Sequence, residues 1–346
     1  ASKYRDPLAR GWAALLRDPR GRPAGVSWDP GIWLNDDVAA QPPTNLPPDA
    51  VWRGIGWAVF HSDLARPERD LMVMFKCSPY GAVSHSHADQ NSFAVMSGGR
   101  ALAIPAGYYF PTYGGPHHAE YTRQTIAHNA ILVNGRGQIV REGRANGRIA
   151  HFETHPRWGY VCGDATAAYG GALRRYLRHL LVIRPSLVIS LDELDAGNPA
   201  EFQWLLHAKE RMEMDEPSQT VISRRRGSWM RVLLTTPGGL RFEQTDEWPV
   251  APSAGFSTLT RPEPPRQWHF TAHTRDQSAQ RRIAAVMMVD AEAEVRSDPE
   301  RGTVHVSGVF DGARTRLVIH LAPGVSPAIE GEVQPPEGPA EPIRIR

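Results

Sequence analysis

The stretch Ser-His-Ser-His-Ala-Asp-Gln-Asn, residues 84–91, lies between a Pro-Tyr-Gly turn and an apolar, strand-like run that begins at Phe93. Two histidines at positions i and i+2 of an extended backbone point to the same side. His85 and His87 should therefore face one cleft, with Asp89 in the same register. Burying two imidazoles beside Asp, Gln and Asn costs free energy, so such a group is expected where it has a function. The stretch predicts a functional site and not a segment of the core.

Composition argues against several classes of partner. The chain has 346 residues and a formal net charge of +2, which is too mild to indicate nucleic acid, and its basic residues form only short local groups. No apolar run is long enough to cross a membrane. We therefore expect no nucleic-acid partner and no membrane partner. The chain opens on Ala1 without an initiator methionine, and we expect it to be a processed or truncated piece.

The organisation of the chain changes once, near Pro48. Residues 8–17 carry the apolar stripe of an amphipathic helix, and residues 36–50 are rich in proline, as linkers are. Beyond them nearly every periodic segment is short and strand-like, with hairpin turn signals between segments. This pattern predicts a mainly β protein, a large antiparallel β-sandwich. The expected strands are Gly56–His61, Leu71–Cys77, Phe93–Met96, Ala101–Ile104, Ala130–Val133, Tyr176–Ile183, Leu187–Leu191, Glu201–His207, Met230–Leu234, Trp268–His273, Arg282–Val289, Val304–Val309 and Arg316–Leu321.

The block from residue 79 to residue 138 contains the 84–91 stretch, Gly107-Tyr108-Tyr109, Tyr121-Thr122-Arg123-Gln124-Thr125 and a strand and turn from His128 to Gly135. On these residues it resembles the heparinase II/III-like polysaccharide lyases, in the branch of the exo-acting oligoalginate and heparin lyases. The resemblance implies an N-terminal helical toroid joined to a β-sandwich, with the active site between them. Residues 1–50 would then be the end of the toroid and a linker, and residues 51–346 the sandwich.

The resemblance also implies a chemistry. Such lyases cleave uronic-acid glycans by β-elimination, in which the C5 proton is removed while the neighbouring carboxylate is neutralised. It makes His85 the catalytic residue of the sandwich, pressing on that carboxylate with help from Gln90, Asn91 or Arg123. The base and acid of the family, a Tyr and a His, come from the toroid, and no segment here matches them. The implied partners are an acidic polysaccharide or oligosaccharide and the toroid of the same protein, in the bacterial periplasm or outside the cell.

Three more residues are candidates for substrate binding. Tyr108 and Tyr121 could line sugar subsites, because aromatic faces stack on pyranose rings while hydroxyls bond to their edges. Each could equally be a packed tyrosine. His117 stands in a loop rich in glycine and proline, where it either faces substrate or is simply solvated.

Metal binding is a separate question. In several relatives a zinc ion lies beneath the site, held by two histidines and an aspartate. His87 and His128 match the histidine positions, but Pro105 replaces the aspartate. Zinc needs about four donors, so we expect at most weak zinc binding at His87 and His128, with Asp89 as the candidate third ligand. The alternative is that both histidines are hydrogen-bonded supports that orient His85.

Two other functions stay open at this stage. One is a noncatalytic carbohydrate-binding or structural sandwich. The other is metal-dependent hydrolysis by His85, His87, Asp89 and His128. The sequence does not choose among alginate, heparin, heparan and chondroitin as the glycan, because part of the substrate site would lie in the toroid.

Overall fold

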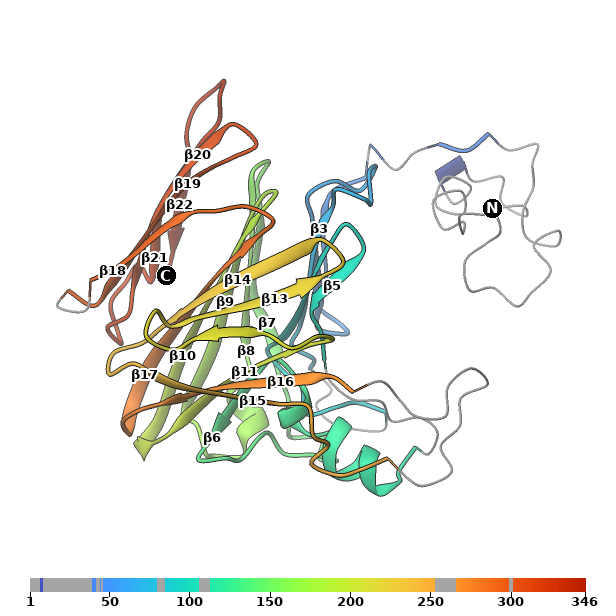
Figure 1. Ribbon diagram of the computed structural model, residues 1–346, viewed down its shortest axis with the longest axis vertical. Helices are drawn as coiled ribbons and strands as arrows, with labels where there is room; N and C mark the ends of the chain where they lie inside the picture. The colour runs from blue at the N-terminus through green and yellow to red at the C-terminus, as the bar shows by residue number, and fades with distance from the viewer. Residues whose placement is uncertain are drawn as a thin grey trace. The chain divides into compact units, whose positions relative to one another are not determined.

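A computed structural model describes residues 7–8, 39–41, 44, 46–79, 85–105, 113–252, 266–298 and 301–346. The chain divides into two compact units, Ala1–Pro48 with Asp63–Pro67, and Asp49–Ser62 with Glu68–Arg346. All the strands described belong to the second unit, and every sheet is antiparallel (Figure 1). The predicted large antiparallel β fold is confirmed. Of the helix expected over residues 8–17, residues 9–17 lie outside the described residues, and the division at residue 50 stays a prediction.

An eight-stranded sheet forms the middle layer of the second unit. Its strand β17 shows why the sequence adopts this fold. The run from Ile283 to Val289 is apolar throughout and buried throughout. Alternate side chains enter two different cores, Ile283 and Met287 on one face and Ala284 and Met288 on the other. The order of strands is β12 (Glu213–Asp215), β13 (Thr220–Arg225), β14 (Ser228–Thr235), β17 (Ser278–Val289), β10 (Leu187–Ala200), β9 (Arg175–Ile183), β8 (Trp158–Asp164) and β7 (Arg148–Thr154).

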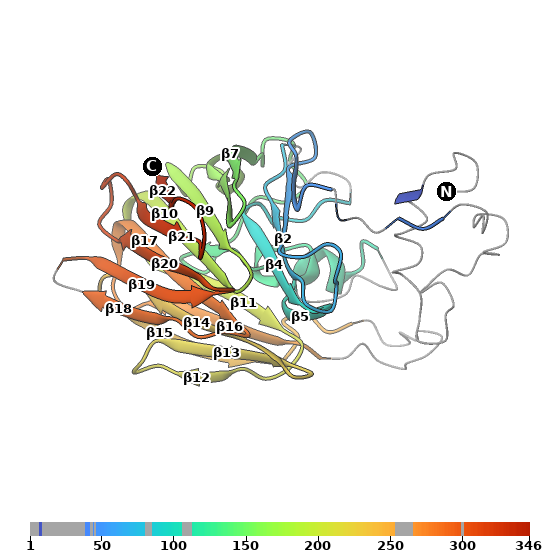
Figure 2. The ribbon, with the colours of Figure 1, turned by 90° about the horizontal axis from the view of Figure 1, so that it is seen from above.

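Two smaller sheets cover the first core, and they adjoin each other. The amide of Ile104, just after β5, donates to the carbonyl of His207 in β11 at 3.1 Å. The two sheets therefore lie side by side over the same core, with β5 next to β11 (Figure 2), and their outward faces point away from that core. One sheet has the order β1 (Asp49–Trp52), β2 (Trp57–His61), β3 (Leu71–Lys76), β4 (Ser92–Ser97), β5 (Arg100–Ala103), and the other the order β15 (Leu240–Thr245), β16 (Trp268–Thr274), β11 (Phe202–Ala208), β6 (Ile131–Val133).

A fourth sheet covers the second core on the other face of the middle layer. Its side chains Val304, Leu317 and Ile329 pack against Leu181 and Val286 of the middle sheet. Its strands are β18 (Glu294–Asp298), β19 (Thr303–Phe310), β20 (Ala313–His320), β21 (Ile329–Gln334) and β22 (Glu341–Ile345).

Each of the thirteen expected strands coincides with an observed one, but one local prediction is wrong. Residues 85–91 are not extended strand; they form turns and loop, and β4 begins only at Ser92. Asn91 adopts a positive φ of 60°, which ends any extended run before the strand.

Cys77 and Cys162 are both buried and free. Among the described residues no helix is long and apolar enough to span a membrane.

Candidate functional site

Histidines gather where the loop 85–91 meets the short helical turns η1 (His118–Thr122) and η2 (Thr125–Ala127). His87 Nδ1 lies 3.3 Å from His128 Nε2, and the ring centroids of His87 and His118 are 5.8 Å apart. Tyr113 continues the row, with its ring centroid 4.6 Å from that of His118 and 4.3 Å from that of His85. His85 and His87 thus meet one cluster, although no strand aligns them. We call these five residues the histidine cluster.

Arg178 fixes the two chain segments that carry the cluster. Its side chain is fully buried, and its Nη1 donates to the carbonyls of both Asn91 and Asn129 at 2.6 Å. Nε and Nη2 hold Asp192 in a two-point ion pair at 2.7 and 2.9 Å. The Asn129 amide in turn donates to the carbonyl of Phe93 at 2.8 Å. The segments after His87 and His128 are therefore tied to the middle sheet through one guanidinium.

A pocket of about 400 Å³ opens beside the cluster on the outward face of β2, β3 and β4. Lys76 and Asp89 form an ion pair at 2.5 Å within it. The pocket joins apolar side chains to a few polar groups, which is the usual composition of a small-molecule site. Its lining residues are Trp57, Met74, Phe75, Lys76, His87, Asp89, Ser92, Phe93, Ala94, Pro105, His128 and Asn129.

Burial keeps most of the clustered histidines neutral. It lowers the pKa of His118 and of His128 to about 4, and it also lowers the pKa of His87. Neutral imidazoles at pH 7 offer one donor and one acceptor each. His85 differs because its side chain is exposed. His85 can therefore meet a ligand from the solvent side, while His87 and His128 line the adjoining pocket.

Three of the predicted substrate-binding residues are buried under the loop. The Gln90 amide nitrogen donates to Gln138 Oε1 at 2.9 Å, Asn91 Nδ2 donates to the Gly163 carbonyl at 3.1 Å, and Arg123 Nε donates to the Ser86 carbonyl at 3.2 Å. These contacts shape the backbone that presents His85. Direct contact of Gln90, Asn91 or Arg123 with substrate stays a prediction.

His117 and Tyr121, also predicted to bind substrate, lie at the start of η1 and within it. His117 is buried, with Nδ1 2.6 Å from the carbonyl of Val250. The hydroxyl of buried Tyr121 lies 3.1 Å from Nδ1 of His269, and burial raises the pKa of that phenol. Tyr108 lies outside the described residues. The structure thus brings His85, His87 and His128 together and places Tyr121 beside a different histidine, His269, with His117 against Tyr121.

The donor set does not complete a zinc site. Among the described residues no three His, Cys, Asp or Glu side chains converge as metal ligands do. His87 and His128 contact each other, while Asp89 is paired with Lys76. Two imidazoles alone fall short of the donors that zinc requires.

Some residues of this region were not singled out by sequence reasoning. Lys76 and His269 lie in the site or next to it, on β3 and β16. The available signal was the density of histidine between residues 85 and 155, which does not include His269.

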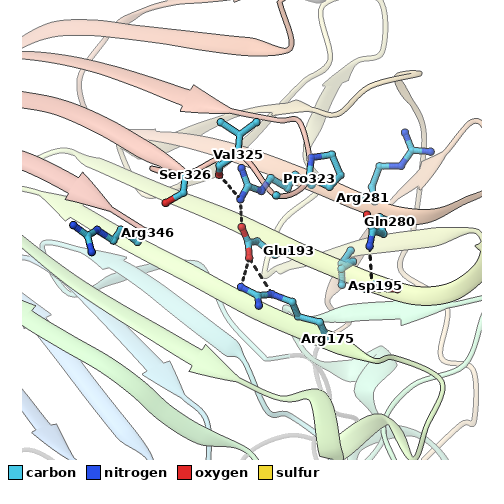
Figure 3. A pocket seen from close by; sticks show the side chains of 12 residues that line it. Arg175, Glu193, Asp195, Gln280, Arg281, Pro323, Val325, Ser326 and Arg346 are labelled. Atoms are coloured by element: carbon cyan, nitrogen blue, oxygen red, sulfur yellow. Dashed lines mark hydrogen bonds and ion pairs between the residues drawn. The ribbon is translucent and has the colours of Figure 1, made fainter.

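A separate pocket of about 380 Å³ lies on the other face of the middle sheet (Figure 3). There Glu193 accepts from Arg175 at 2.8 Å and from Arg282, and Asp195 accepts from Gln280 at 3.0 Å. Because both carboxylates already accept hydrogen bonds, we interpret this cluster as a network of ion pairs and hydrogen bonds at the edge of the second core. It offers no free carboxylate for acid–base chemistry.

Comparison with known proteins agrees with the fold. The family model for the heparinase II/III-like C-terminal domain matches residues 44–302. No curated protein sequence matches the chain.

Two solved structures illustrate the likeness. The heparan sulfate lyase HepC from Pedobacter heparinus is 14% identical, with a TM-score of 0.58, over 84% of this chain and 43% of that one. A heparinase III is 13% identical, with a TM-score of 0.59, over 85% of this chain and 42% of that one. At such identities the likeness is one of fold. The chain spans less than half the length of either protein.

Proposed function

The chain belongs to the heparinase II/III-like C-terminal domain family, and from that membership we propose that it is the sandwich half of a lyase that cleaves uronic-acid glycans by β-elimination. The observation that carries the proposal is the exposed His85 at the end of a row of buried, neutral imidazoles. An exposed imidazole next to neutral imidazoles suits a reaction in which one group must meet a carboxylate.

In this mechanism His85 binds the substrate carboxylate and stabilises the charge that develops when the C5 proton leaves. Hydrogen bonds to that charge are worth more in the transition state than in the ground state. His87 and His128 hold the loop beneath His85 through their 3.3 Å contact. Gln90, Asn91 and Arg123 fix its backbone. No step needs a metal at His87 and His128.

The base and the acid remain to be supplied. Elimination needs a group that removes the C5 proton and one that protonates the leaving oxygen. We propose that an N-terminal helical domain of the same protein supplies a Tyr and a His for these steps, as the resemblance implies. The match covers only 43% and 42% of the two solved structures, which is consistent with such a domain. A polymeric glycan substrate suits a periplasmic or secreted protein, where we place it.

Product absorbance tests the proposal. Only elimination creates a 4,5-unsaturated uronide, which absorbs in the near ultraviolet. The full-length protein should release such product from at least one of oligoalginate, heparan sulfate and chondroitin sulfate, and this chain alone should release almost none. Binding of a glycan by the full-length protein with no unsaturated product would instead favour a noncatalytic carbohydrate-binding sandwich. Full activity in this chain alone would refute the division of the site.

A further inference from the structure

A second pocket opens on the same outward layer as the histidine cluster. It has a volume of about 310 Å³ and lies over β11, β15 and β16. That size is at the lower end of the range for small-ligand sites and suits a single sugar residue. Its polar lining includes Tyr121, His207, Glu243, Glu247, His269 and Thr271.

One layer of side chains separates this pocket from the first. Asn129 lines the first pocket, and its Oδ1 lies 3.0 Å from Nδ1 of His207, which lines the second. His207 Nε2 is also 2.9 Å from the carbonyl of Ile126. Because the two sheets adjoin at Ile104 and His207, both pockets face away from the same core. A glycan that crosses the outward layer can therefore occupy both.

The chemistry of the second pocket differs from that of the first. Burial lowers the pKa of His269 to about 4, so this imidazole is neutral at pH 7. The carboxylate of Glu247 is exposed at the pocket, while that of Glu243 accepts from Arg241 at 3.1 Å and lies 2.8 Å from Nε2 of His273. Among the described residues that line it, none is Lys or Arg. Such a site offers acceptors to hydroxyl and amine donors and repels a carboxylate or sulfate.

We propose that the second pocket is a sugar subsite that selects a residue without an acidic group, a neutral or amino sugar, next to the uronate bound at the histidine cluster. This inference rests on the function proposed above. A chain made of uronates alone would bring a carboxylate against Glu247. A chain in which the uronate is followed by a hexosamine would instead bring hydroxyls and an amide to His269, Thr271 and Glu247.

Equilibrium binding tests the subsite without requiring turnover. In the full-length protein carrying His85→Ala, calorimetry compares two tetrasaccharides, one alternating glucuronate with N-acetylglucosamine and one of mannuronate alone. We expect the alternating tetrasaccharide to bind more tightly. We expect Glu247→Lys to shift the ratio of the two dissociation constants by about tenfold toward the mannuronate. Glu337→Lys, the same charge change at an exposed turn of the fourth sheet, should leave the ratio unchanged.

A second variant guards against an indirect effect of charge. Thr271→Trp fills the pocket and should weaken binding of the alternating tetrasaccharide at least about tenfold, with an unchanged circular dichroism spectrum. An unaltered ratio in Glu247→Lys, or unaltered affinity in a folded Thr271→Trp protein, overturns the subsite. Absence of binding for both tetrasaccharides also overturns it. Failure of the proposed function looks different, because the wild type would then release no unsaturated product from any glycan.

Discussion

The carbonyl oxygens of Asn91 and Asn129, on two separate segments, both lie 2.6 Å from Nη1 of Arg178. A single guanidinium, itself held by buried Asp192, therefore sets the distance between the loop that carries His85 and the turn that carries His128. The geometry of the site depends on a residue that does not contact the pocket.

Arg178→Met should lower the free energy of unfolding by about 3–5 kcal/mol, because it leaves Asp192 buried without its cation. Urea unfolding measures the loss. Arg175→Met is the matched control, on the same strand but with a side chain 57% exposed against Glu193, and it should cost less than about 1 kcal/mol. Equal losses in the two variants would mean that the buried pair has no special weight.

The part of the fold that sequence predicts best is the part where side chains alternate between two cores or between core and solvent. The run from Ile283 to Val289 is predictable as a buried strand because every residue in it is apolar. Strand β8 was not expected, since Gly159 and Gly163 interrupt its pattern. Contacts with distant residues require both glycines. A Cβ on Gly163 would lie 2.0 Å from Oδ1 of Asn91, and one on Gly159 would lie 2.5 Å from the Phe60 ring. No local pattern reveals such close approaches.

The candidate site was predictable only where its residues are adjacent in sequence. The pair His85 and His87 marked the region, although the expected strand is a loop held by contacts from distant residues. His207 and His269 face one another across β11 and β16, and neither strand sequence differs from that of an ordinary half-buried strand. Their meeting is set by sheet register, which the sequence pattern alone did not specify.

His85→Ala in the full-length protein should reduce elimination by about a hundredfold to a thousandfold, because it removes a contact made chiefly in the transition state. Since His85 is exposed, the urea midpoint should stay unchanged. His87→Ala is the comparison, and it should lower both activity and stability, because His87 supports the loop through His128. An active His85→Ala protein would remove this residue from the mechanism.

Stability should fall as the solution becomes acidic. The folded-state pKa values of His118, His128 and His269 are lowered by burial to about 4, below the value of about 6.5 in the unfolded chain. The unfolded state therefore binds protons first, and the free energy of unfolding decreases from about pH 6.5 to about pH 4. Urea midpoints across this range measure the effect.

The contribution of His179 to stability has the opposite pH dependence. Burial alone would lower its pKa, but the neighbouring Cys162 and the Glu193 carboxylate, 3.9 Å from Nε2, raise it to about 9. Its contribution is complete below about pH 6.5 and is lost as the pH rises toward about 9. We expect His179→Gln to flatten the decline on the alkaline side and to leave the acidic decline intact. An alkaline decline of the same size in this variant would contradict the assignment.

Zinc binding at His87 and His128 should be weak. The two imidazoles lie 3.3 Å apart, Pro105 lines the same pocket, and Asp89 is engaged by Lys76 at 2.5 Å. Elemental analysis of protein purified without chelator should therefore give well under one zinc per chain after dialysis. Lys76→Met tests the cause, because it releases Asp89 from its ion pair and should increase the zinc retained. Stoichiometric zinc in the wild type would show that Asp89 or another donor completes the shell, and His128→Ala should then abolish it.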